Sequence, residues 1–216
     1  MAERRKEGPG IPTRRAQEKA RPEDLDAASD EAARCRACDL WKNATQTVFG
    51  VGGKGARIML VGEQPGDQED LTGLPFVGPA GKVLDRALQD AGIDRNKVYV
   101  TNAVKHFKFE PRGKKRIHKK PSEHEIDACH RWLERELAAL APTLVVALGA
   151  TAARALLGRA TAIGANRSRL KDLTPDCKLL ITVHPSFLLR VPPEYRDAEY
   201  KAFVADLKLA VPFVGT

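Results

Sequence analysis

Short apolar runs alternate with amphipathic segments along most of the chain. Four runs rich in β-branched residues predict strands, at 58–61, 97–103, 144–148 and 178–183. Apolar residues at helical spacing predict helices at 23–34, 79–91, 122–140, 150–157 and 194–209. Strands that alternate with helices form parallel sheets covered on both faces. The sequence therefore predicts an α/β fold for residues 23–216, a single domain built as a three-layer α/β/α sandwich with a central four-stranded parallel sheet.

The first predicted strand is followed by a segment dense in polar side chains. The backbone leaves this strand through Gly62, Pro65 and Gly66, which are residues that favour sharp turns. The same turn and the Gly/Pro-rich loop after it carry Glu63, Gln64, Asp67, Glu69, Asp70 and Phe76. Ligands of open α/β sheets bind past the carboxyl ends of the strands, so we expect the functional site here.

The charge of the chain indicates a polyanionic partner. The 216 residues contain 36 Lys and Arg against 28 Asp and Glu, a net charge of +8. Basic residues cluster in a predicted loop at 104–120, and residues 1–22 are predicted to be a disordered basic tail. There is no apolar run of the roughly 20 residues that a membrane span needs, and no apolar core of a signal peptide, so we expect a cytoplasmic protein.

Two of the four cysteines have the spacing of metal ligands. Cys35 and Cys38 form a C-x₂-C pair, Cys129 lies on the apolar face of a predicted helix, and Cys177 lies in a predicted loop. The pair fits a zinc site or an iron–sulfur cluster, and it also fits two incidental thiols. Spacing alone leaves the fourth ligand open among Cys177, His106, His124 and His130.

Five short motifs together resemble the uracil-DNA glycosylase superfamily. They are GEQPG at 62–66, GLPFVGPAG at 73–81, VTNAVKH at 100–106, KKRIH at 114–118 and HPS at 184–186. Within that superfamily the chain is most similar to the UdgX group, relatives of the family 4 iron–sulfur enzymes that couple covalently to DNA. The resemblance covers about 35–211, and its one departure in the basic motif is Lys115 where Arg is usual.

The resemblance implies a set of uracil-binding and DNA-binding residues. Phe76 corresponds to the aromatic residue that stacks on a flipped uracil, and Asn102 to the amide that reads the base edge. His184 corresponds to the donor to uracil O2, and Gln64 and Asp67 also belong to the implied uracil site. The implied DNA contacts are Lys114, Lys115, Arg116 and Ser186.

The resemblance also implies a covalent step. His118 corresponds to the histidine that captures the sugar C1′ after the base has left, and the carboxylate of Glu63 could hold its tautomer or accept its proton. Gln64 does not titrate at neutral pH, so its catalytic role is positioning of water, of uracil or of the loop that carries His118. The alternatives are a turnover glycosylase of the same fold and a non-catalytic iron–sulfur module that binds nucleic acid.

For the cysteines, the resemblance favours a [4Fe–4S] cluster held by Cys35, Cys38, His106 and Cys129. Family 4 enzymes use four cysteines, and His106 stands where one of them is expected, which keeps Cys177 as the alternative ligand. We expect the cluster to be structural, because cleavage of a glycosidic bond needs no electron transfer. The expected partner is uracil-containing DNA, including single-stranded DNA, and the expected state is a monomer.

Overall fold

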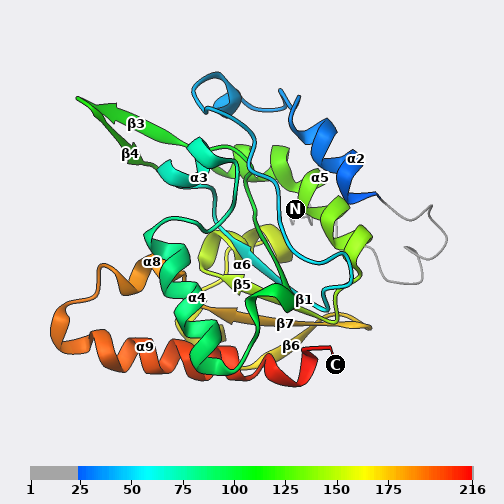
Figure 1. The fold of residues 1–216 in the computed structure, drawn as a ribbon, viewed down its shortest axis with the longest axis vertical. Coiled ribbons are helices and arrows are strands. Elements are labelled where there is room, and N and C mark those ends of the chain that lie inside the picture. Colours follow the sequence, from blue (N-terminus) through cyan, green and yellow to red (C-terminus); the bar gives the residue numbers. More distant parts are fainter. Residues whose placement is uncertain (1–23, 216) are drawn as a thin grey trace, which may run out of the picture.

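The computed structural model describes residues 24–215, which form a layered α/β domain (Figure 1). Its central sheet has the strand order β2-β1-β5-β7-β6. Four of these strands are parallel: β2 (Val98–Asn102), β1 (Ile58–Gly62), β5 (Leu144–Leu148) and β7 (Cys177–Thr182). The predicted α/β class and the four predicted parallel strands are thus confirmed.

A fifth strand, β6 (Leu170–Thr174), was not predicted. It pairs antiparallel with β7 through a turn at Pro175 and Asp176 and forms one edge of the sheet. The segment has no continuous apolar run because its side chains are partly or fully exposed. An edge strand of this kind lacks the sequence signal of a buried one.

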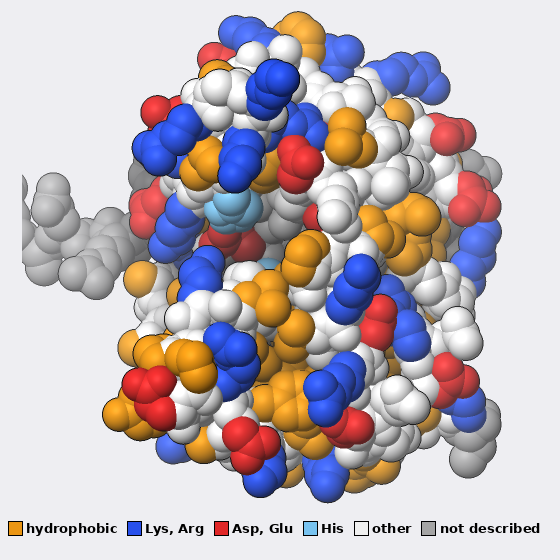
Figure 2. Space-filling model, turned by 60° about the vertical axis from the view of Figure 1, so that its left-hand side comes forward, with side chains coloured by type: hydrophobic (Ala, Val, Ile, Leu, Met, Phe, Trp, Pro, Cys, Tyr) orange, Lys and Arg blue, Asp and Glu red, His pale blue; other side chains and the backbone are white. Residues whose placement is uncertain are grey.

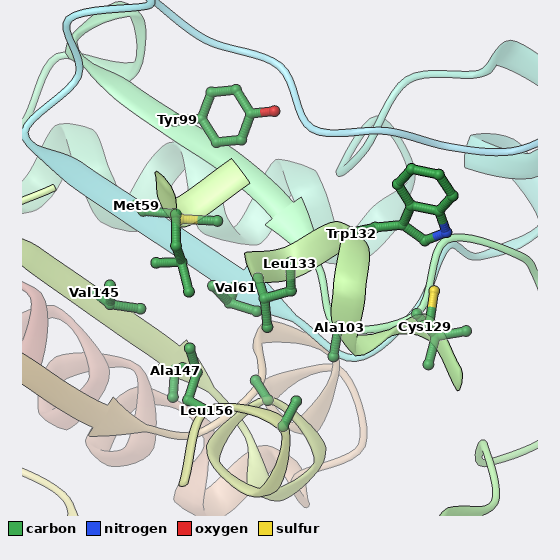
Figure 3. Packing of buried hydrophobic residues seen from close by; sticks show 14 of the residues in the cluster. Met59, Val61, Tyr99, Ala103, Cys129, Trp132, Leu133, Val145, Ala147 and Leu156 are labelled. Atoms are coloured by element: carbon green, nitrogen blue, oxygen red, sulfur yellow. The ribbon is translucent and has the colours of Figure 1, made fainter. Parts of the chain in front are cut away.

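Alternate residues of the strands pack on opposite faces of the sheet. Met59 and Val61 face the helices α2 (Leu25–Ala32), α5 (Glu123–Leu140) and α6 (Ala150–Leu157), as part of the packing in Figure 3. Ile58 and Leu60 face the opposite way, toward α4 (Pro79–Ala91) and α9 (Pro193–Lys208). A strand covered on both faces reads as an unbroken apolar run, which is why the sequence located it.

The predicted long helices are present, and short elements join them. The Ser122 hydroxyl accepts a hydrogen bond from Glu125 N at 3.3 Å, so the predicted capping box of α5 is confirmed. The short helices are α3 (Asp67–Thr72), α7 (Ile163–Asn166) and α8 (Pro185–Leu188), with 3-10 turns at Asp39–Lys42, Arg95–Lys97 and Val211–Phe213. Among residues 24–215, none of the helices is both long enough and apolar enough to span a bilayer.

The predicted basic loop at 104–120 is largely a β-hairpin, which corrects that part of the prediction. Strands β3 (Phe109–Arg112) and β4 (Lys115–His118) pair antiparallel and project from the body of the domain beside α3 (Figure 1). Both strands are mostly exposed, so they lack the apolar alternation that would have revealed them. The predicted basic tail at 1–22 lies outside the described residues.

Candidate active site

A cavity of about 720 Å³ opens where the carboxyl ends of the parallel strands meet. Glu63 follows β1, Asn102 ends β2, Gly149 follows β5, and His184 follows β7. The cavity is the hollow beside the pale-blue histidine in Figure 2. Eight of the predicted site residues line it: Glu63, Gln64, Asp67, Phe76, Asn102, His118, His184 and Ser186.

Phe76 and Asn102 form one wall of this cavity. The Phe76 backbone has φ of +58°, and its ring centroid lies 5.9 Å from that of His184. Asn102 is only 2% exposed, and its Oδ1 atom has no hydrogen-bond partner within the described chain. A buried polar atom without a partner is costly, so Oδ1 is an acceptor suited to a ligand's N–H.

Gly62 allows these two side chains to approach the end of β1. A Cβ atom at this position would lie 2.4 Å from Asn102 Oδ1 and 2.5 Å from Phe76 Cζ. Both distances are far shorter than a van der Waals contact. The glycine therefore creates the space in which the aromatic ring and the amide sit together.

His184 is a neutral hydrogen-bond donor to the cavity. Its Nδ1 atom accepts a hydrogen bond from Ser186 N at 3.2 Å, and the Ser186 hydroxyl lies 2.8 Å from the same nitrogen. Burial, reinforced by the nearby His118 and Arg190, lowers the pKa of His184 to about 4. Because a neutral imidazole whose Nδ1 accepts must carry its proton on Nε2, that nitrogen is the donor.

His118 reaches the cavity from the hairpin. Its side chain is half exposed, and its Nε2 atom lies 3.4 Å from Glu63 Oε1. The other carboxylate oxygen of Glu63 accepts a hydrogen bond from the Thr151 hydroxyl at the start of α6. The structure thus brings together His118 and Glu63, two of the predicted catalytic residues. Sequence reasoning missed Thr151, although its place two residues after Gly149, the glycine that follows β5, was a usable signal.

Gln64 fixes the base of the hairpin. Its amide nitrogen donates to Lys108 O at 3.1 Å and to Lys119 O at 3.0 Å, and its Oε1 atom accepts from Lys108 N at 3.1 Å. Of the three positioning roles that the sequence left open, these contacts favour the one toward the segment that carries His118.

Arg116 holds the hairpin to α3. The guanidinium donates to Asp67 Oδ1 at 2.6 Å and to the fully buried Asp70 at 2.5 Å, and it lies over the rings of Phe107 and Phe109. A direct DNA contact by Arg116 stays a prediction, since most of its donors bind Asp67, Asp70 and Thr45 here. Lys114 and Lys115 lie at the exposed tip of the hairpin.

Three of the predicted cluster ligands are buried or half-buried thiols near the carboxyl end of β2. Cys35 Sγ accepts from the Trp132 indole at 3.2 Å, and Cys129 Sγ accepts from Lys105 N at 3.2 Å. Burial raises the pKa of Cys38, and it raises the pKa of Cys129 to about 12. His106 is 5% exposed, and its Nε2 atom lies 2.9 Å from the Thr47 hydroxyl.

These residues match the donor chemistry of an iron–sulfur cluster, with N–H groups already directed at the sulfur atoms. Within residues 24–215, however, no three His, Cys, Asp or Glu side chains stand in a metal-binding arrangement. Cys177 lies at the opposite end of the sheet, because it begins β7 whereas His106 follows the end of β2. That separation favours His106 over Cys177 as the fourth ligand.

A buried ion pair joins the cavity to the thiols, and sequence reasoning missed it. Lys105 Nζ lies 2.6 Å from Glu136 Oε2 and donates to the carbonyl of Asn102 at 2.8 Å. Tyr99 and Thr101 also donate to Glu136. The signal was available, since Glu136 is an acid on the apolar face of α5, three residues after Leu133.

Taken together, the fold and the cavity define an α/β domain that can hold a flat heterocycle between an aromatic ring, an amide and an imidazole. The chain belongs to the uracil-DNA glycosylase superfamily: the family model described as "Uracil DNA glycosylase superfamily" matches residues 49–208.

Curated relatives agree with this assignment. The chain is 38% identical to a type-4 uracil-DNA glycosylase of Thermotoga maritima over 171 residues, which are 79% of this chain and 85% of the relative. It is 36% identical to a type-4 uracil-DNA glycosylase of Archaeoglobus fulgidus over 193 residues, 86% of this chain and 91% of the relative. A type-5 uracil-DNA glycosylase of Thermus thermophilus is 38% identical over 125 residues, 51% of this chain and 53% of that protein.

Proposed function

We propose that this protein excises uracil from DNA and that His118 then captures the sugar as a covalent adduct. The observation that carries the proposal is the position of His118 Nε2, 3.4 Å from Glu63 Oε1 in the cavity that also holds Phe76, Asn102 and His184. The similarity to type-4 uracil-DNA glycosylases supports the excision step.

Uracil is recognised by its flat ring and its hydrogen-bonding edge. Taking the base out of the DNA stack costs a few kcal/mol, which every base-flipping enzyme must overcome. Stacking on Phe76 holds the base once it is flipped. The unpartnered Oδ1 of Asn102 accepts from uracil N3–H, and the amide nitrogen donates to O4. Cytosine has an unprotonated N3 and an amino group at these positions, so it leaves both groups unsatisfied.

The excision step breaks the bond between C1′ and uracil N1. Both electrons of this bond pass to the base, whose negative charge spreads to O2, and the sugar becomes oxocarbenium-like. The Nε2–H of neutral His184 donates to O2 as that charge develops, which lowers the barrier because the hydrogen bond strengthens in the transition state.

The capture step forms a bond between C1′ and a ring nitrogen of His118. The unprotonated nitrogen supplies the electron pair, and the proton on the other nitrogen passes to Glu63 or to the uracil anion. Glu63 is oriented for this by the Thr151 hydroxyl, which holds its other oxygen. The products are free uracil and an N-alkylated histidine joined to the DNA strand.

We further propose that Cys35, Cys38, His106 and Cys129 hold a [4Fe–4S] cluster. When bound, the cluster would serve as a cross-link between the segment before β1, the start of the hairpin segment and α5, and the reaction uses none of its electrons. The indole and backbone N–H groups that already reach the sulfur atoms of Cys35 and Cys129 support this ligand set.

Lys114 and Lys115 at the hairpin tip, together with Ser186 beside His184, are the proposed contacts to the DNA backbone. The exposure of the two lysines on the hairpin that carries His118, and the place of Ser186 in the cavity lining, support contact with the phosphates that flank the flipped uracil.

The test is a denaturing gel of the protein after incubation with a single-stranded oligonucleotide containing one uracil. We expect a band of lower mobility that survives heat and detergent, absent for His118→Ala and present for the control His124→Ala, an exposed histidine on α5. Strand breakage after alkali without such a band would show ordinary turnover and would reduce His118 to a DNA contact. The absence of both the shifted band and the strand breakage would overturn the glycosylase function.

The same assay tests Glu63. We expect Glu63→Gln to slow adduct formation far more than Glu194→Gln, a change at an exposed acid in the first turn of α9. Equal effects would remove Glu63 from the mechanism.

Iron and sulfide analysis tests the cluster ligands. We expect His106→Ala to lose iron and Cys177→Ala to retain it. Full retention of iron and sulfide in His106→Ala would refute the proposed ligand set.

A further inference from the structure

A second hollow, of about 540 Å³, lies between α4, α8 and α9. Its floor is apolar and its margins are basic. The floor includes Leu188 and Tyr200, and the basic residues are Lys82, Arg86 and Arg196. We call this hollow the α4–α9 groove.

The groove adjoins the catalytic cavity. Leu189 lines both hollows, and its side chain is 47% exposed, so it forms an apolar ridge between them. In Figure 2, apolar side chains run from the hollow beside the pale-blue histidine toward the bottom of the molecule, with Lys and Arg on both sides. The exposed Arg190 lines the cavity at the same boundary.

The charges of the groove favour an anionic occupant. Its one acid, Asp197, already pairs with Lys201 at 2.8 Å, and Lys82 has no side-chain partner among the described residues. Arg86 lies over the Tyr200 ring at 5.2 Å, and Arg196 donates to Val191 O at 3.2 Å. Both arginines keep further N–H groups for a ligand, because a guanidinium has five.

An apolar floor with basic margins is the combination that binds single-stranded nucleic acid, in which bases pack on side chains and phosphates meet cations. A groove for an apolar peptide would not need three cations along its margin. Double-stranded DNA keeps its bases stacked inside the duplex, so it could not use the floor.

We propose that the α4–α9 groove is a subsite for the single-stranded DNA next to the excised uracil. This proposal rests on the proposed glycosylase function and extends it, because it names a stretch of strand beyond the flipped nucleotide. The strand leaves the cavity over Leu189, its phosphates contact Lys82 and Arg196, and its bases lie over Leu188 and Tyr200.

The test compares oligonucleotides of different length in single-turnover uracil release. The substrates are a five-nucleotide strand with a central uracil and two longer strands, one extended by ten nucleotides on the 5′ side and one on the 3′ side. The readouts are the maximal rate and the protein concentration that gives half of it. For the unaltered protein, we expect one of the two extensions to lower the half-saturating concentration.

The variants are Lys82→Glu and Arg196→Glu, with Lys208→Glu as the matched control. Lys208 is exposed and lies on the same helix as Arg196, about 18 Å further along it by the rise per residue. We expect each groove variant to raise the half-saturating concentration for the extended strand by about three- to tenfold and to weaken its salt dependence. The maximal rate on the extended strand should stay unchanged. The maximal rate and the half-saturating concentration for the five-nucleotide strand should also stay unchanged, and Lys208→Glu should alter neither quantity for any strand.

Unchanged half-saturation in both groove variants would overturn the subsite and leave the glycosylase function intact. Equal weakening for the short and the extended strands would also overturn it, because it would indicate a general field effect. The absence of uracil release from every strand by the unaltered protein would instead be a failure of the proposed function itself.

Discussion

Two histidines face the same cavity, and the chain holds them in different ways. His184 lies two residues past the end of the parallel strand β7, and its Nδ1 atom is fixed by the backbone and the hydroxyl of Ser186. His118 sits on an exposed hairpin, and its one close polar neighbour in the described chain is Glu63 at 3.4 Å. The difference suits two roles, since a donor to a developing anion must be rigid, whereas a nucleophile must move toward C1′ as the base leaves.

The loss of the rigid histidine should have the largest effect. We expect His184→Ala to slow uracil release by about 10²- to 10³-fold, because a preorganised donor to the leaving base is removed. His118→Ala should release uracil at close to the unaltered rate and form no adduct. Rapid mixing with quantification of free uracil measures the rate of release in both variants. Similar losses of uracil release in the two variants would contradict the proposed division of roles.

Filling the space beside Gly62 at the end of β1 should slow uracil release slightly less than the loss of His184. In Gly62→Ala the new Cβ would meet Asn102 Oδ1 and Phe76 Cζ, so both groups must shift away from the base. We expect uracil release to fall by about 10²-fold, since displacements near 1 Å cost that much. Gly55→Ala is the control, because a Cβ there meets nothing within 4 Å. Normal release by Gly62→Ala would mean that the base binds elsewhere.

The sequence could predict the half of the site built on the central sheet better than the half built on the hairpin. Glu63, Asn102 and His184 lie at or just past the ends of buried strands. Such strands read as apolar runs, so their shared edge was predictable. The hairpin was predicted as a loop because its strands are exposed, and its shape depends on Gln64 and Arg116, whose partners are distant in the sequence. Thr151 and Glu136 had local signals, but those signals did not reveal their partners, because Glu63 and Lys105 are more than thirty positions away in the sequence.

The buried environment of His184 should appear in the pH dependence of stability. Its pKa is about 4 in the folded protein and about 6.5 when unfolded, so between these values the unfolded state binds more protons. Stability should therefore fall as the pH drops from 6.5 toward 4, by about 3 kcal/mol in all. Urea unfolding at several pH values measures this drop, which should be smaller in His184→Gln and unchanged in His124→Gln. Equal drops in all three proteins would mean that His184 is solvated.

The smallest effect should come from loosening the hairpin without touching its histidine. Gln64→Ala removes three hydrogen bonds that tie Lys108 and Lys119 to the end of β1, so His118 should spend less time beside Glu63. We expect adduct formation to slow by about tenfold, the cost of roughly one net hydrogen bond, while uracil release changes less. Gln68→Ala is the matched control, because Gln68 lines the same cavity but its side chain does not hold the hairpin. If Gln64→Ala slowed release and capture equally, Gln64 would act on uracil itself, and the hairpin would need no help from it to present His118.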